Sequence, residues 1–316
     1  MRVIVAGATG AVGMPVVTRL LAAGHHATGI VRNAHGVGEL RAAGADAVIA
    51  DVLDREAVLR ATSDISADVV VSELTALKKP PARHGDMHET DRLRIDGTAN
   101  LLEVAQQTNA TRFVTQSMIF GYGYRDLGVT PLTEESPFGT PQGDRFDEHL
   151  EAMASNERQV FGADGIDGIA LRYGLLYGND AESVAAMLKR RAIPSARVGG
   201  GLAFIHHLDA ADATVAAIER GRGGAYNVVD DVPATFRELL DSVAAAYHVP
   251  RPYVLPNWML RAFAPYAAKM MTGVNMRASN EKAARELGWR PRYRSINDGV
   301  LAGVHAKAGG TASVQH

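Results

Sequence analysis

The chain has 316 residues, longer than most single domains but within the range of a doubly wound α/β unit with an added lobe. Hydrophobic residues make up 47% and charged residues 22%, and this composition excludes a disordered or fibrous chain. The net charge of −2 provides no basic surplus, so we expect no nucleic-acid or membrane partner. Cysteine is absent, which excludes disulfides, thiolate nucleophiles, iron–sulfur clusters and cysteine-ligated zinc.

No segment is typical of a leader peptide or of a membrane span. The first residues form a short apolar run that ends at Gly7, whereas a signal peptide needs a longer apolar region and a cleavage site. No run approaches the roughly 18 apolar residues that a transmembrane helix needs. Together with the lack of cysteine, this favours a cytoplasmic protein.

The first half of the chain alternates short β-branched runs with helical stretches. We expect strands at residues 3–6, 28–31, 47–50, 69–72, 112–115 and 168–171. We expect helices at residues 12–23, 37–42, 55–61, 88–107 and 146–161. The strands are continuously apolar, which is typical of a parallel sheet covered on both faces. This order predicts an α/β fold with a Rossmann-type doubly wound parallel sheet.

The second half predicts a smaller C-terminal substrate-binding lobe. Its expected helices lie at residues 209–219, 236–247, 258–271 and 280–287. We assign residues 1–172 to the dinucleotide-binding domain, to which the chain returns near 203–229, and residues 173–316 mainly to the lobe. The small, polar residues 306–316 predict a disordered tail. Trp258 is interpreted as lobe core; the alternative is a roof over an apolar substrate.

The turn after the first strand carries the strongest functional signal. Gly7 permits a tight turn, Gly10 leaves room for a pyrophosphate, and Gly13 lets the next helix pack closely on the strand. A lone glycine pattern also occurs in structural turns, but here strand, loop and helix come in the required order. The predicted contacts to the dinucleotide are Gly7, Thr9, Gly10, Ala11, Val12 and Gly13.

The ends of the second and third strands indicate which dinucleotide binds. An acidic residue after the second strand would bind the ribose 2′-hydroxyl of NAD, but Arg32 and Asn33 stand there. Arg32 offers a guanidinium for a 2′-phosphate, which favours NADP over NAD; the alternative is a solvated strand-end charge. Asp51 and Val52 are predicted at the adenine, while Asp54 could equally be a helix N-cap.

These residues resemble the extended short-chain dehydrogenase/reductase family, in its NAD-dependent epimerase/dehydratase-like branch. The resemblance covers nearly the whole chain. Its motifs lie at residues 7–13, 51–54, 96–102, 112–117, 171–178, 204–212 and 225–228. It implies that the loop after the fourth strand, with Leu74 and Thr75, lies along the nicotinamide side of the cofactor. Lys78 and Lys79 follow in this loop and could replace a missing catalytic lysine or simply be solvated.

The catalytic pair of the family is absent. Its tyrosine stands in Y-x-x-x-K, and none of the nine tyrosines has a lysine four residues later. If Glu157 matches the glutamate eight residues past that tyrosine, His149 takes the tyrosine position and Met153 the lysine position. The sequence therefore predicts an atypical catalytic centre.

Four residues are predicted to replace the missing pair. Hydride transfer to a carbonyl builds an alkoxide, which needs a proton or hydrogen-bond donor. Ser117 could polarise the carbonyl or only cap its loop, and Tyr122 or Tyr124 could act as the acid or pack on the substrate. His149 titrates near neutral pH and could act as the acid or lie on a helix surface.

His84 and His88 are spaced as a zinc-binding pair on a helix would be. Pro80, Pro81 and Gly85 argue against a regular helix through both. The sequence therefore predicts no metal site.

The sequence favours an NADP(H)-dependent oxidoreductase that acts on a small carbonyl or alcohol substrate. One alternative is a nucleotide-sugar epimerase or dehydratase that uses its cofactor transiently. Another is a non-catalytic dinucleotide sensor, which only the loss of the catalytic pair favours. The resemblance also implies a homodimer that pairs through the helices at residues 88–107 and 146–161.

Overall fold

The computed structural model describes residues 1–311, and the surroundings of side chains up to residue 303. Its centre is a seven-stranded sheet in the order β10-β6-β5-β4-β1-β2-β3, with all neighbours parallel. The strands are β1 (Arg2–Ala6), β2 (His26–Val31), β3 (Asp46–Ile49), β4 (Val69–Ser72), β5 (Arg112–Met118), β6 (Asp167–Tyr173) and β10 (Gly224–Val228). The predicted doubly wound parallel sheet is therefore confirmed.

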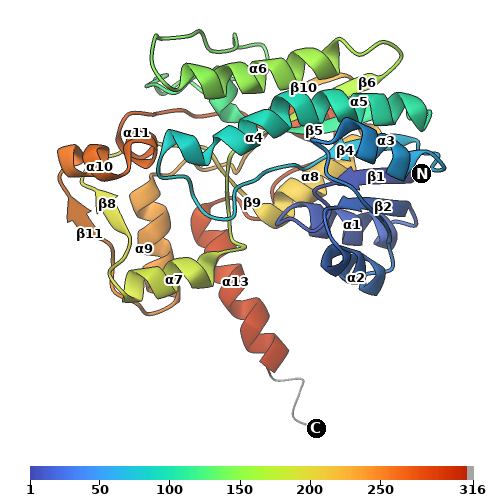
Figure 1. Cartoon of the computed structure of the whole chain (residues 1–316). Coiled ribbons are helices and arrows are strands. Elements are labelled where there is room, and N and C mark those ends of the chain that lie inside the picture. The colour runs from blue at the N-terminus through green and yellow to red at the C-terminus, as the bar shows by residue number, and fades with distance from the viewer. Residues whose placement is uncertain (312–316) are drawn as a thin grey trace.

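Helices cover both faces of this sheet (Figure 1). One core lies between the sheet and α1 (Gly13–Ala22), α2 (Ala34–Ala42) and α8 (His207–Arg220). The other core lies between the sheet and α3 (Arg55–Thr62), α5 (Thr98–Gln107) and α6 (Asp147–Phe161). Because both faces are buried, strand β4 is apolar at three successive positions, as the continuous runs predicted.

The predicted helix at residues 88–107 consists of three segments. It begins as α4 (His88–Arg92), passes through a π-helical turn, η2 (Leu93–Gly97), and continues as α5. A short 3₁₀ turn, η1 (His84–Asp86), precedes it, and a second, η3 (Ile119–Tyr122), follows β5. These segments bring the chain after β4 back beside the start of α6.

Most of the remaining elements pack around a third apolar core. The helices are α7 (Ala181–Lys189), α9 (Phe236–Ala246), α10 (Asn257–Phe263), α11 (Pro265–Thr272), α12 (Glu281–Glu286) and α13 (Ile296–Thr311). The short strands pair as β7 (Leu175–Tyr177) with β9 (Phe204–His206), and β8 (Pro194–Ala196) with β11 (Tyr253–Leu255).

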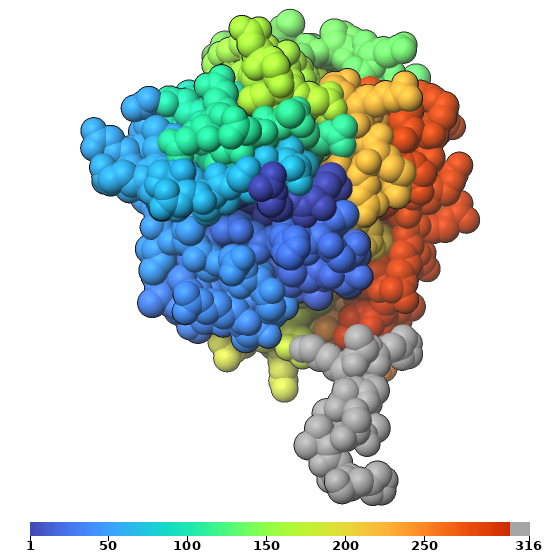
Figure 2. Space-filling model, turned by 90° about the vertical axis from the view of Figure 1, so that its right-hand side faces the viewer, coloured from blue at the N-terminus to red at the C-terminus, as the bar shows by residue number. Residues whose placement is uncertain are grey.

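The chain returns to the large sheet through α8 and β10. The space-filling view shows this gold segment between the blue N-terminal part and the red C-terminal part (Figure 2). Helix α8 packs on α1, and α12 packs on β10. Trp289 is buried in the same core as α1 and α8.

Three expectations about the second half are wrong, the third only in part. The helix expected at residues 258–271 is two helices, because Pro265 lacks an N–H and starts α11 instead of continuing α10. Trp258 does not lie in the lobe core, because it is 70% exposed. Part of the predicted tail, residues 306–311, belongs to α13, and residues 312–316 lie outside the described part. Among residues 1–311, no helix is long and apolar enough to cross a bilayer.

Candidate active site

The turn between β1 and α1 is built by its glycines. Gly7 has φ +78°, and a Cβ atom there would lie 2.5 Å from the carbonyl oxygen of Glu73. A Cβ on Gly13 would lie 2.1 Å from the carbonyl oxygen of Gly7. Only hydrogen side chains therefore allow the strand, the turn and the helix to approach this closely.

The tip of this turn is open to solvent. Thr9, Gly10 and Ala11 are exposed, while Val12 is buried and anchors the start of α1. No side chain caps the N-terminus of α1. Its first amide groups and the positive end of its dipole are therefore available to an anionic group such as a phosphate.

Arg32 and Asn33 follow β2 next to this turn. The Asn33 side chain caps α2 by accepting a hydrogen bond of 3.1 Å from the amide of Gly36. The methyl carbon of Thr9 is 3.5 Å from the place of a Cβ on Gly36, so the start of α2 lies beside the glycine turn. The exposed Arg32 side chain is 3.8 Å from Glu89 at the start of α4, a distant pairing that leaves its guanidinium free for another anion.

The turn after β3 contains the predicted adenine contacts. The carboxylate of Asp51 accepts a hydrogen bond of 3.0 Å from the amide of Leu53. Val52 is buried, and its carbonyl oxygen accepts a hydrogen bond of 2.7 Å from the Asn100 side chain. Asp54 caps α3 by accepting a hydrogen bond of 3.0 Å from the amide of Ala57. The hypothesis that Asp54 is a helix N-cap is therefore confirmed.

The loop after β4 leads from the glycine turn toward α4. Leu74 packs against the core between the sheet and α5. Thr75 accepts a hydrogen bond of 3.2 Å from the amide of Leu77, and the amide of Ala76 donates to Thr90 of α4 over 3.2 Å. These contacts fix the loop beside the first turn of α4.

Glu73 lies at the base of the glycine turn and is fully buried. Its Oε1 accepts hydrogen bonds from the Tyr173 hydroxyl (2.8 Å) and the Thr214 hydroxyl (3.2 Å), while Oε2 has no hydrogen-bond partner among the residues whose side chains the structure describes. Burial raises the pKa of Glu73 to about 7, although the two hydroxyls counteract this.

Ser117, at the end of β5, is buried and directed into an ion pair. Its hydroxyl donates a hydrogen bond of 2.7 Å to Oε1 of Glu157 on α6. Glu157 also pairs with Arg172 of β6 through distances of 2.9 and 2.6 Å. A hydroxyl held in this way is occupied and does not point freely toward a bound ligand.

Tyr122 belongs to the same group of residues. The Arg172 guanidinium lies 4.9 Å from the centre of its ring. Its buried hydroxyl donates to the Asn227 side chain, 2.8 Å away on β10, or to the carbonyl of Thr133, 2.9 Å away. Burial raises the pKa of Tyr122, so its phenol is a poorer acid than a solvated tyrosine.

Tyr124 and His149 lie in a separate aromatic cluster. The Tyr124 ring is 4.7 Å from that of Phe146, and Phe146 is 5.2 Å from Tyr266 of α11. His149 contacts Tyr266 at 5.6 Å between ring centres. Burial raises the pKa of Tyr124 well above its ordinary value. The cluster joins α6 to the C-terminal half of the chain.

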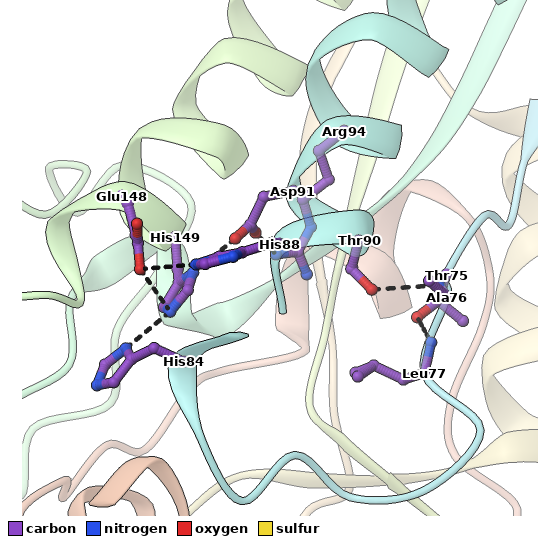
Figure 3. A network of polar contacts seen from close by, with 10 residues as sticks. All are labelled: Thr75, Ala76, Leu77, His84, His88, Thr90, Asp91, Arg94, Glu148 and His149. Carbon is purple, nitrogen blue, oxygen red and sulfur yellow. Dashed lines mark hydrogen bonds and ion pairs between the residues drawn. The ribbon is translucent and has the colours of Figure 1, made fainter. Parts of the chain in front are cut away.

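His149 is completely buried and hydrogen-bonded on both ring nitrogens (Figure 3). Its Nδ1 is 2.6 Å from the carboxylate of Asp91 on α4, and its Nε2 is 2.9 Å from Nδ1 of His84 on η1. The expectation of a possible helix-surface histidine is thus wrong. Burial is the largest cause that lowers the pKa of His84, with His149 next.

The four predicted catalytic residues therefore form two groups. Ser117 and Tyr122 surround Arg172, whereas Tyr124 and His149 share the aromatic cluster. Asp91 and Arg172 were not predicted from the sequence as partners of these residues, and neither was the pairing of His84 with His149. These partners come from segments far apart in the chain, so local spacing carries no signal for them.

A family model described as NAD dependent epimerase/dehydratase family matches residues 3–229. A 3-diazoavenalumate denitrifying reductase from a Streptomyces species is 37% identical over 313 residues, which covers 95% of this chain and 99% of that protein. Among solved structures, the UDP-glucose 4-epimerase of Thermotoga maritima, with UDP-glucose, has a TM-score of 0.79 at 18% identity and covers 98% of this chain and 100% of its own.

The UDP-glucose 4-epimerase of Bifidobacterium longum, in complex with NAD+ and UDP, has a TM-score of 0.77 at 19% identity and covers 98% of this chain and 99% of its own. These two structures show the shared fold, while the family match includes the glycine turn and α6. The chain belongs to the NAD-dependent epimerase/dehydratase family.

Proposed function

We propose that the chain is an NADP(H)-dependent reductase that transfers hydride to a small electrophilic substrate. The observation that carries this choice is that none of the nine tyrosines has a lysine four residues later. If Glu157 matches the family's glutamate, His149 and Met153 of α6 take the positions of the family's tyrosine and lysine. Epimerase and dehydratase reactions begin by removing a proton from a sugar hydroxyl, which requires a strong base. A methionine in place of the lysine does not support that step.

The preference for NADP(H) rests on Arg32. Its side chain is 62% exposed, and its nearest anionic partner, Glu89, is 3.8 Å away and also exposed. A 2′-phosphate would form charge-assisted hydrogen bonds with the guanidinium, which are stronger than this distant pairing. No acidic residue follows β2 to bind the 2′-hydroxyl of NAD.

The lack of a ready proton donor among these residues guides the choice of substrate class. A carbonyl acceptor becomes an alkoxide when hydride arrives, so it needs a hydrogen-bond donor. Neither Tyr122 nor Tyr124 is a ready acid, because burial raises the pKa of both. A substrate that can accept hydride without a strong proton donor therefore fits these residues better than an ordinary sugar ketone does.

A diazo compound is the second candidate, favoured by the 37% identical denitrifying reductase. A diazonium group, C–N₂⁺, accepts hydride at its terminal nitrogen to give a diazene, C–N=N–H. The diazene loses N₂ and its hydrogen passes to carbon, which leaves a C–H bond, while NADPH becomes NADP⁺. No alkoxide forms in this reaction, so the missing tyrosine and lysine would not be needed.

The proposal is tested with NADPH deuterated at the transferred hydride position. The purified protein is incubated with a panel of small aldehydes and ketones and, separately, with an ortho-diazophenol. Deuterium in an alcohol would identify a carbonyl reductase, and release of N₂ with replacement of the diazo group by hydrogen and equimolar oxidation of NADPH would identify a diazo reductase. Interconversion of UDP-sugars without net cofactor use would overturn the proposal, as would cofactor binding with no turnover of any substrate.

A further inference from the structure

Four potential metal ligands meet where η1, α4 and α6 come together (Figure 3). The ligand atoms of His84, Glu148 and His149 all lie within 4.8 Å of one another. His88, at the first position of α4, places its Nε2 3.5 Å from Oε1 of Glu148. Glu148 and His149 are neighbours at the start of α6, while the other two histidines come from the loop and helix that pack against it.

We propose that this cluster binds a divalent metal ion of the zinc class through His84, Glu148 and His149, with His88 as the fourth side chain within reach. Imidazole nitrogens and a carboxylate are the ligands that such ions prefer when cysteine is absent. Two ligand atoms about 2 Å from a tetrahedral ion lie about 3.3 Å apart. The separations from His149 Nε2 to His84 Nδ1, 2.9 Å, and to Glu148 Oε1, 3.7 Å, bracket this spacing.

The surroundings of His149 are those of a positioned ligand. Its Nδ1 donates to the carboxylate of Asp91 over 2.6 Å, so the lone pair of Nε2 is directed at the cluster. Asp91 is held in turn by Arg94 at 3.2 Å. Such a carboxylate behind a histidine fixes the tautomer and increases the basicity of the ligand nitrogen.

Packing also fixes His84. Its ring lies edge-on to Phe146 at 4.6 Å between centres, and edge-on to Tyr266 at 5.7 Å. Both His84 and His149 are buried, whereas the side chains of Glu148 and His88 are about half exposed. The site thus has a rigid inner wall and an outer side through which an ion can enter from solvent.

The site was not expected from the sequence, because Pro80, Pro81 and Gly85 argue against one regular helix through His84 and His88. The structure contains no such helix: His84 lies in the 3₁₀ turn and His88 starts α4. The missing ligands come from α6, 60 or more residues further along the chain.

The location suggests what the ion does. If Glu157 matches the family's glutamate, His149 takes the position of the family's tyrosine, and an ion bound to it would replace the tyrosine hydroxyl as the group that polarises a substrate oxygen. This role rests on the proposed function. The binding site itself does not, because it follows from His84, Glu148 and His149, whose ligand atoms all lie within 4.8 Å of one another.

The test uses the full chain without an affinity tag, stripped with a chelator and dialysed. Zn²⁺ binding is measured by calorimetry and Co²⁺ binding by visible absorption, both without nucleotide or substrate. We expect one ion per chain and a Co²⁺ band of tetrahedral type. Glu148→Gln and His84→Gln should each weaken Zn²⁺ binding about tenfold or more.

The control is His35→Gln. His35 also pairs with a glutamate, Glu39, four residues further on, and both side chains lie on the exposed side of α2. This control should leave binding unchanged. Lack of stoichiometric binding, or equal binding by all three variants, would overturn the proposal and leave the contact of His84 with His149 as a plain hydrogen bond. Because no turnover is measured, failure of the reductase proposal would not alter this result.

Discussion

Arg172 forms a two-point ion pair with Glu157, with Nε–Oε1 and Nη2–Oε2 distances of 2.9 and 2.6 Å. Both side chains are at least 93% buried. The pair joins β6 to α6. Glu157 also accepts a hydrogen bond from the Ser117 hydroxyl of β5, so the pair connects three elements near the carboxyl edge of the sheet. Its function in the fold is to hold α6 against β5 and β6.

Glu157→Gln should lower the free energy of unfolding by about 3 kcal/mol, because it leaves the Arg172 charge buried and unpaired. The measurement is a urea titration followed by circular dichroism. The control is Glu151→Gln on the same helix, whose partner Arg158 is exposed. That control should change the free energy by less than about 0.5 kcal/mol. Equal effects of the two variants would contradict this account of the pair.

Gly13→Ala should destabilise the protein by at least about 2 kcal/mol and abolish dinucleotide binding. The reason is the 2.1 Å approach of the new Cβ to the carbonyl oxygen of Gly7, which must push α1 away from the turn. Gly38→Ala in α2 is the matched control, because its Cβ would meet nothing within 4 Å. It should stabilise the protein by about 0.5 kcal/mol. A tolerated Gly13→Ala would show that the close approach is not required.

Glu73 should make stability depend on pH. Its pKa is about 7 in the folded chain and near the ordinary glutamate value, about 4.3, after unfolding. Between these two pH values Glu73 is protonated in the folded chain but not in the unfolded chain. The free energy of unfolding therefore falls as the pH rises from about 4 to 7. The loss from this group is on the order of 3 kcal/mol.

Glu73→Gln keeps an acceptor for Tyr173 and Thr214 without a titrating group. The difference in unfolding free energy between wild type and Glu73→Gln, measured from pH 5 to pH 8, isolates this one residue from all others. As the pH rises, the unfolding free energy of Glu73→Gln should increase relative to that of the wild type. A difference that does not change with pH would mean that Glu73 is not protonated when buried.

The homodimer implied by the family resemblance would bury the outer sides of η2 and α6. Ile95 and Phe161 are the large apolar side chains exposed there, at 39% and 45%. Changing both to aspartate should convert a dimer to a monomer in light scattering, because the interface would then bury charge. Ile49→Asp, on exposed β3, should leave the mass unchanged. A wild-type monomer, or a dimer that survives the double change, would reject this pairing.

The sequence predicted the sheet and the glycine turn because their signals are local. A continuously apolar strand and a glycine at a fixed position each describe their own surroundings, as Gly7 and Gly13 illustrate. The N-cap role of Asp54 was also visible, since a cap bonds to an amide three residues away.

The surroundings of the candidate catalytic residues could not be predicted in the same way. His149 meets Asp91 and His84 only because α4, η1 and α6 pack together, and no spacing encodes this packing. Trp258 was assigned to the core from its residue type, but burial depends on the neighbours that the fold supplies. Ser117 was predicted at the correct strand end, but its hydrogen bond to Glu157 depends on α6.

The preference for NADP(H) is tested by a fluorescence titration of the purified protein with NADPH and NADH, for wild type and Arg32→Ala. Any cofactor retained through purification is identified first. We expect exchangeable binding that is selective for NADPH, and an affinity for NADPH, but not for NADH, that is about tenfold or more lower in the variant. Equal affinity of wild type for the two nucleotides, or equal loss of both in Arg32→Ala, would contradict this preference.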